Sequence, residues 1–147
     1  MKICVLIKQV PDKNSSLTIA EDYRSLEETN ITWVSNESDN YALEEALQLK
    51  EKYGGEVVAC TLGNESARQV LKDAMAKGVD RSIFLSDSQF DSLDILSIAK
   101  VFASVLKDES FDLILSGLQS DDQGNSQLGI LIAELLGMSH ASLVMST

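Results

Sequence analysis

The segment from Ser116 to Gly129, SGLQSDDQGNSQLG, concentrates side chains that could bind a ligand. It lies between two apolar runs, FDLIL and ILIAELLG, and holds aspartates, glutamines, an asparagine, serines and glycines, but no lysine or arginine. The N-terminus of a helix exposes unpaired backbone N–H groups with partial positive charge, and small residues let a phosphate or carboxylate approach them closely. The segment therefore predicts a ligand-binding turn in which the backbone supplies the positive potential.

The two aspartates of this segment, Asp121 and Asp122, restrict what a ligand can present to them. They would repel a phosphate, so a nucleotide would have to offer a ribose or adenine donor there, as it does to acidic residues in dinucleotide folds. The glutamines can bond adenine or ribose edges with either end of their amides. A purely structural interpretation stays open, in which the aspartates form Asx turns, Asn125 or Ser126 caps the next helix and Gln127 is solvated.

Other chemistries lack the residues that they need. The sequence contains neither G-x-x-x-x-G-K-[ST] nor G-x-G-x-x-G. Its one histidine, His140, is far along the chain from Cys4 and Cys60, which lie in apolar runs typical of buried, reduced thiols. We therefore expect no metal centre and no site for bond-breaking chemistry. Lys8 follows the first apolar run. It could lie at the ligand-binding edge of the sheet or form an ion pair with an acidic residue, and the sequence alone does not distinguish the two roles.

The composition is that of one globular domain. The chain has 147 residues, of which 44% are hydrophobic and 24% charged, and its formal net charge is −11. This acidity argues against binding to nucleic acid or to an anionic membrane. The N-terminal sequence MKICVLIKQVPD has too short an apolar run for a spanning helix or a signal peptide, so we expect no membrane insertion and a cytoplasmic location.

The spacing of apolar residues predicts strands that alternate with helices. Strands are expected at residues 2–7, 56–62, 82–85 and 111–115. Helices are expected at 39–53 with Ser38 or Asp39 as N-cap, from an Asn64 cap to Gly78, at 93–107 and at about 125–136. A long polar segment that contains a small hairpin is expected at residues 12–37. A final short apolar stretch is expected at residues 142–145.

This alternation predicts an α/β fold, with a parallel sheet between two layers of helices. In such folds ligands bind beyond the carboxyl ends of the strands, near the point where strand order reverses. Residues 6–11, 62–65 and 116–127 would lie along that edge.

Four blocks of sequence resemble one family in their order and spacing. They are MKICVLIKQVPD at the start, ALEEALQLKE from Ala42, LKDAMAKGVDR from Leu71, and SGLQSDDQGNSQLG from Ser116. Together they resemble the β subunit of electron transfer flavoprotein over essentially the whole chain.

This resemblance implies a fold and a function. It implies a Rossmann-like domain of the adenine nucleotide hydrolase-like type that binds a structural AMP, or FAD in its place in electron-bifurcating members. It also implies a heterodimer with an α subunit that holds FAD and receives electrons from flavin dehydrogenases. The subunit would then be an electron carrier without an enzymatic reaction of its own.

By the same resemblance, nucleotide contacts fall on fourteen positions: Leu6, Asn36, Glu37, Ser38, Asp39, Leu62, Asp122, Gln123, Gly124, Asn125, Ser126, Gln127, Leu128 and Gly129. Many members carry three acids where this chain has residues 122–124, and a threonine at the position of Leu128. Contacts at Gln123, Gly124 and Leu128 are therefore expected to use the backbone.

Family members run on past the equivalent of Met145, with a loop for dehydrogenases and an arm around the α subunit. The resemblance thus implies that residues 1–147 form a single nucleotide-binding domain, truncated relative to the full-length subunit. The alternative is a stand-alone adenine-nucleotide sensor of the universal-stress-protein type. Those proteins usually carry a G-x-x-G-x(9)-G-[ST] loop, which this sequence lacks.

Overall fold

The computed structural model describes residues 1–144, and within them it contains a parallel sheet with the strand order β5-β4-β1-β6. Its strands are β1 (Lys2–Leu6), β4 (Glu56–Leu62), β5 (Arg81–Leu85) and β6 (Leu113–Ser116). Strand β1 is central, since it pairs with β4 on one side and β6 on the other, so that Leu6 lies opposite both Cys60 and Ser116. A strand buried on both faces needs an unbroken apolar run, which is what the sequence provides.

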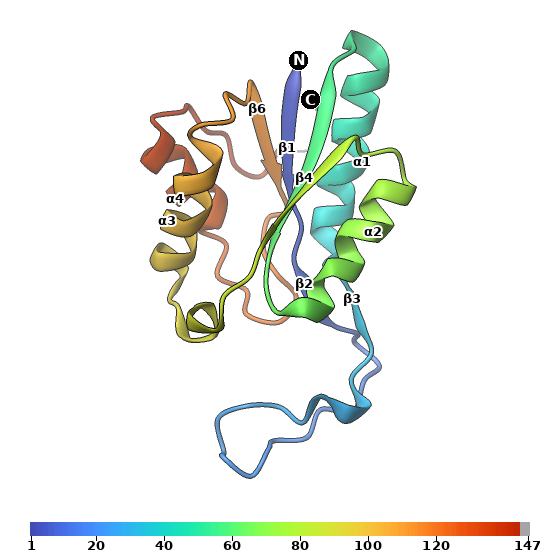
Figure 1. Ribbon diagram of the computed structural model, residues 1–147, viewed down its shortest axis with the longest axis vertical. Helices are drawn as coiled ribbons and strands as arrows, with labels where there is room; N and C mark the ends of the chain where they lie inside the picture. Colours follow the sequence, from blue (N-terminus) through green and yellow to red (C-terminus); the bar gives the residue numbers. More distant parts are fainter. Residues whose placement is uncertain (145–147) are drawn as a thin grey trace.

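Two layers of helices cover this sheet (Figure 1). On one face lie α1 (Glu37–Tyr53) and α2 (Arg68–Ala76), and on the other α3 (Ile95–Leu106) and α4 (Leu128–Leu136). Short 3-10 turns are η1 (Glu28–Asn30), η2 (Glu65–Ala67) and η3 (Ser88–Ser92). The predicted three-layer α/β fold of Rossmann-like type is confirmed.

Alternate residues of β1 enter two separate hydrophobic cores. Ile3 and Val5 pack under α1 and α2, whereas Cys4 and Leu6 pack under α3 and α4. Cys60 joins Cys4 in the second core, and both thiols are free and buried. Burial raises the pKa of each thiol, that of Cys60 to about 12, which disfavours the thiolate form that nucleophilic chemistry needs.

Two helix starts differ from the prediction for identifiable reasons. Helix α1 begins at Glu37 with Asn36 as N-cap, so the predicted cap at Ser38 or Asp39 was wrong. These two side chains bond instead to a loop after β6. Helix α4 begins at Leu128, later than predicted, because Gly124 and Ser126 adopt positive φ angles of 63° and 55° that no right-handed helix includes.

The other boundaries lie close to expectation. The segment from Asn64 to Gly78 contains η2 followed by α2, and the Asn64 side chain accepts a bond from the Ser66 N–H as a cap should. Helix α3 follows an Asp94 cap. Residues 142–144 of the final apolar stretch form neither helix nor strand, and Met145 lies outside the described residues.

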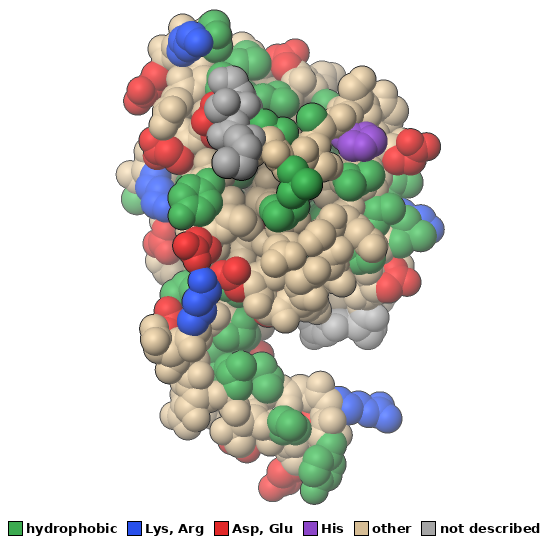
Figure 2. Space-filling model, turned by 180° about the vertical axis from the view of Figure 1, so that it is seen from behind, with side chains coloured by type: hydrophobic (Ala, Val, Ile, Leu, Met, Phe, Trp, Pro, Cys, Tyr) green, Lys and Arg blue, Asp and Glu red, His purple; other side chains and the backbone are tan. Residues whose placement is uncertain are grey.

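The polar excursion forms an arm, residues 12–32, that projects from the domain (Figures 1 and 2). At its base β2 (Gln9–Pro11) and β3 (Trp33–Ser35) pair antiparallel, so a hairpin is present, but its first strand lies before the stretch 12–37 in which it was predicted. Farther out the two sides of the arm form a β-bridge between Ile19 and Leu26. No helix within residues 1–144 has both the length and the apolar character needed to cross a membrane.

A charged cluster ties the amino ends of the sheet together and predicts a pH effect. The Glu109 carboxylate accepts bonds from Arg81 Nη2 at 2.6 Å and from Lys2 Nζ at 2.8 Å, so it links the starts of β5 and β1. These bonds, that of Arg81 first, lower the pKa of Glu109 from 4.5 to about 2. A lowered pKa contributes stability above pH 4.5 that is lost as the pH falls toward 2.

We therefore expect Glu109→Gln to lower the free energy of unfolding at neutral pH and to flatten its decline between pH 4.5 and 2. Urea unfolding at a series of pH values measures both effects. Glu51→Gln is the matched control, because it removes the same charge from an exposed position of α1. Equal pH profiles for the two variants would contradict the prediction.

Candidate functional site

A hollow opens where the carboxyl ends of β1 and β6 meet. From β1 the chain continues to β4 on one side of the sheet, whereas β6 lies on the other, so this is the point where strand order reverses. The hollow spans about 740 Å³ of space that protein atoms do not fill, and this figure includes open solvent.

One buried carboxylate joins the elements around this hollow. Asp39, in the first turn of α1 and only 6% exposed, accepts the N–H of Lys8 at 2.8 Å and the N–H of Gly117 at 2.9 Å. It thus holds the ends of β1 and β6 together at the start of α1. Burial raises the pKa of Asp39, and the two N–H bonds oppose that shift.

The loop that follows β6, residues 117–127, is fastened to the same helix start. Asn36 donates its amide to the Gln119 carbonyl at 2.9 Å and accepts the Asp121 N–H at 2.9 Å. The Ser38 hydroxyl also donates to the Gln119 carbonyl. Gly117 must be glycine here, because a Cβ would collide with the side chains of Ser38 and Asp39.

The second half of the loop is held by Lys8, a cation from the short segment between β1 and β2. Lys8 Nζ lies 2.8 Å and 2.7 Å from the two carboxylate oxygens of Asp122, and it also reaches Gln123 Oε1 at 3.2 Å and Ser120 Oγ at 3.4 Å. Burial raises the pKa of Asp122, but the bonds from Lys8 and Ser120 outweigh it, so the pKa lies below its usual value. Lys8 both lines the hollow and pairs with an acid, so the two alternatives for it are true together.

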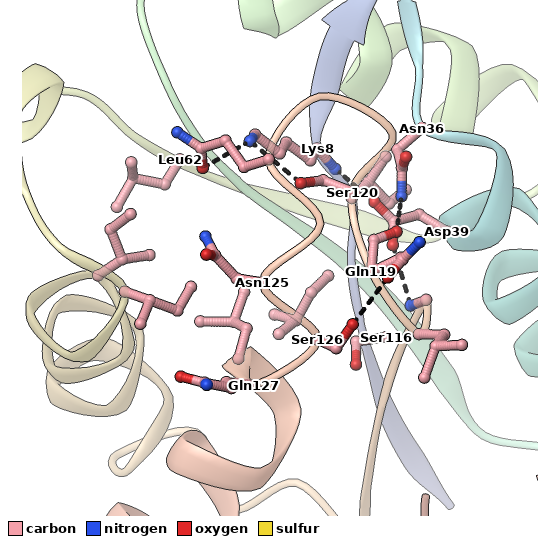
Figure 3. A pocket seen from close by; sticks show the side chains of 18 of the residues that line it. Lys8, Asn36, Asp39, Leu62, Ser116, Gln119, Ser120, Asn125, Ser126 and Gln127 are labelled. Carbon is pink, nitrogen blue, oxygen red and sulfur yellow. Dashed lines mark hydrogen bonds between the residues drawn. The ribbon is translucent and has the colours of Figure 1, made fainter. Parts of the chain in front are cut away.

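Two amide side chains line the hollow beside the start of α4. Asn125 and Gln127 line the hollow, and their amides form no hydrogen bond within residues 1–144 (Figure 3). The hydrogen-bond ladder of α4 starts with the Leu131 N–H to the Gln127 carbonyl, so the first-turn N–H groups before Leu131 have no partner within the helix. Gly129 lets this turn approach β6, since a Cβ would lie 2.9 Å from Ser116 Oγ.

The opposite wall is apolar and comes from four elements. Its residues are Leu6, Leu62, Ile95, Ile98, Phe102 and Leu128. The contribution of α3 was missed from the sequence, because its apolar side chains have the spacing of ordinary core residues. The rule that ligands bind beyond the carboxyl ends of the strands selects β1, β4 and β6. It does not indicate that residues of α3 also line the hollow.

The structure brings nine of the fourteen expected positions to the hollow: Leu6, Asn36, Asp39, Leu62, Gln123, Asn125, Ser126, Gln127 and Leu128. The other five do not line it. Glu37 pairs with Lys13 at the base of the arm, Ser38 and Asp122 fasten the loop, and Gly124 and Gly129 shape the backbone. Contact of any of the fourteen with a nucleotide stays a prediction.

Comparison with known proteins identifies the family. Residues 24–147 match the family described as electron transfer flavoprotein domain. The chain belongs to the electron transfer flavoprotein family. Membership confirms the resemblance drawn from the four sequence blocks and disfavours the universal-stress-protein alternative.

Named relatives are similar over nearly the whole chain. The electron transfer flavoprotein subunit beta of Bacillus subtilis (strain 168) is 37% identical over 137 residues, which cover 92% of this chain and 52% of the relative. That of Methylophilus methylotrophus is 32% identical over 146 residues, 98% of this chain and 55% of the relative. Protein FixA of Azorhizobium caulinodans is 34% identical over 143 residues, 94% and 50% respectively. The chain thus spans about half the length of the relatives that it matches.

The bridging carboxylate of this family member predicts a stability effect. Asp39→Ala leaves the N–H groups of Lys8 and Gly117 without their acceptor. Because a buried N–H without a partner costs about 1–3 kcal/mol, we expect the free energy of unfolding to fall by about 3 kcal/mol. Urea unfolding measures the loss, and Asp73→Ala on the exposed face of α2 should change stability by less than about 0.5 kcal/mol. Similar losses in both variants would contradict the bridging role.

Proposed function

We propose that this domain binds an adenine nucleotide in the hollow and serves as the nucleotide-binding part of an electron transfer flavoprotein β subunit. AMP is the expected occupant, and FAD takes its place if the chain belongs to the electron-bifurcating branch. The observation that carries the proposal is the combination, at the strand-order reversal, of an apolar wall, two amides without a hydrogen bond among residues 1–144, and the start of helix α4.

The residues of the hollow fit such a ligand chemically. An adenine ring can stack against the apolar wall, and the amides of Asn125 and Gln127 offer both donors and acceptors to its edge or to a ribose. The free N–H groups at the start of α4 suit a phosphate, and Gly129 keeps that turn close to β6. The fit requires no cationic side chain, because the backbone N–H groups supply partial positive charge.

We also propose that the subunit is an electron carrier and not an enzyme. Flavin would supply the redox chemistry, in an α subunit that pairs with this chain and receives electrons from flavin dehydrogenases. In that assembly, the residues described here bind and orient the nucleotide and keep the loop closed. A cytoplasmic location, as expected from the sequence, stays a prediction.

The first experiment is to denature the purified chain and identify any released small molecule by mass spectrometry and absorbance. AMP without a flavin spectrum would support the ordinary branch, and FAD would support the bifurcating branch. If the protein is purified empty, AMP at 100 times its dissociation constant should stabilise the folded state by about 2.7 kcal/mol. For a domain of this size the melting temperature should then rise by about 5–10 °C. No released nucleotide and no such rise would refute the proposal.

Two variants test the free amides of the hollow. Asn125→Ala and Gln127→Ala each remove a side chain that can bond the nucleotide, and one neutral hydrogen bond contributes about 0.5–1.5 kcal/mol, so AMP should bind about three- to tenfold more weakly. Calorimetric titration measures the change. The control is Gln69→Ala, since that amide bonds Asp73 on α2, away from the hollow. Unchanged affinity in both test variants would place the nucleotide elsewhere.

A further inference from the structure

The loop beside the hollow consists of two halves that are held in different ways. Residues 117–121 are fastened to the start of α1 by hydrogen bonds with Asn36 and Asp39, whose side chains are buried. Residues 122–127 have no such bond within the described part of the chain. Their hydrogen bonds stay within the loop or lead into α4, except for those that Lys8 donates. One cation therefore connects the second half of the loop to the rest of the domain.

Lys8 combines a fixed backbone with a releasable side chain. Its N–H donates to Asp39 at 2.8 Å, and its carbonyl accepts the N–H of Asn36 at 2.9 Å. From this fixed point its ammonium group reaches both carboxylate oxygens of Asp122, at 2.8 Å and 2.7 Å. The side chains of this ion pair are 36% and 28% exposed. Water and salt weaken ion pairs that they can reach, so this pair can break while the backbone of Lys8 stays in place.

The second half of the loop also contains the backbone positions at which it can move. Gly124 and Ser126 have positive φ angles of 63° and 55°. Glycine adopts this conformation freely, whereas serine adopts it only at a cost in energy, so the closed form of this half needs bonds that hold it. This half also contributes four residues to the lining of the hollow: Gln123, Asn125, Ser126 and Gln127. A movement of this half would therefore change access to the hollow.

We propose that residues 122–127 form a flap that closes the hollow, that Lys8 latches this flap through Asp122, and that the nucleotide enters and leaves when the latch opens. The two latch residues are positioning residues, because they act through the position of the flap. The latch closes the empty and the loaded hollow alike, so breaking it speeds entry and release equally and leaves the affinity unchanged. The proposal rests on the proposed nucleotide site and adds how exchange at that site is controlled.

Two variants break the latch from opposite sides. Lys8→Met removes the cation but keeps an unbranched apolar side chain, and Asp122→Asn removes the anion, whose side chain does not line the hollow. The latch predicts the same effect from both. A direct bond from Lys8 to a phosphate predicts opposite effects, because the first variant would lose that bond and the second would free the lysine to strengthen it. The control is Lys13→Met, which removes the same charge from a lysine beside Glu37 and Asp121.

The experiment measures the release of radiolabelled AMP into an excess of unlabelled AMP, together with the dissociation constant from calorimetric titration. Loss of a partly exposed, hydrogen-bonded ion pair should make both latch variants release AMP about five to ten times faster than the wild type, with dissociation constants within about twofold. Added salt should speed release from the wild type but not from Lys8→Met. Lys8→Arg, which keeps the cation, should restore slow release, and Lys13→Met should behave as the wild type.

Amide hydrogen exchange without nucleotide tests the flap independently of the nucleotide site. Exchange in residues 122–127 should be faster in both latch variants than in the wild type, and exchange in residues 117–121 should be unchanged. If AMP does not bind but this difference is found, the proposed function fails and the flap stands. The flap is refuted by unchanged exchange in residues 122–127, by opposite changes of AMP affinity in the two latch variants, or by equally fast release from Lys13→Met.

Discussion

The geometry of the site depends on the two backbone hydrogen bonds that Asp39 accepts. β1 and β6 are neighbours in the sheet, but the chain that leaves β1 moves away to the arm, and the chain that leaves β6 enters a glycine-containing loop. Their diverging ends would leave N–H groups unpaired beside an apolar wall. A carboxylate in the first turn of α1 satisfies both N–H groups at once, in a position where the helix dipole favours negative charge. A single side chain therefore joins the start of the loop, the residue after β1 and the first turn of α1.

The polar loop lacks cations in its sequence but not in its surroundings. Lys8 supplies the missing charge from 114 residues earlier in the chain, and Lys13 at the base of the arm approaches the neighbouring aspartate. Both aspartates thus face lysines contributed by the β1–β2 region, and the backbone of the loop remains available to a ligand. An acidic segment is compatible with the proposed phosphate site because lysines from outside the segment lie next to both of its aspartates.

The central strands are the elements that the amino-acid sequence predicts best. β4 was predicted within its observed bounds and β1 within one residue, because strands buried on both faces must be apolar throughout. The location of the site followed from the strand-end rule. The bonds that its residues form within the protein did not, since Asn36 and Ser38 bond to the Gln119 carbonyl, an interaction across more than 80 positions that no spacing reveals. Phe102 and Ile98 were not predicted to line the hollow, because apolar residues that line a pocket and apolar residues of the core have the same spacing along a helix.

The arm shows how this fold can tolerate change in chain length. Its two ends are already side by side, since Pro11 pairs with Trp33, and its described outer part has only one further strand bridge. The entropy of closing a flexible loop grows only with the logarithm of its length, by about 0.6 kcal/mol for each doubling. Insertions or deletions beyond this closing pair would therefore change the free energy of the domain very little. The arm is a segment whose length can diverge among related chains while the sheet, its helices and the hollow stay the same.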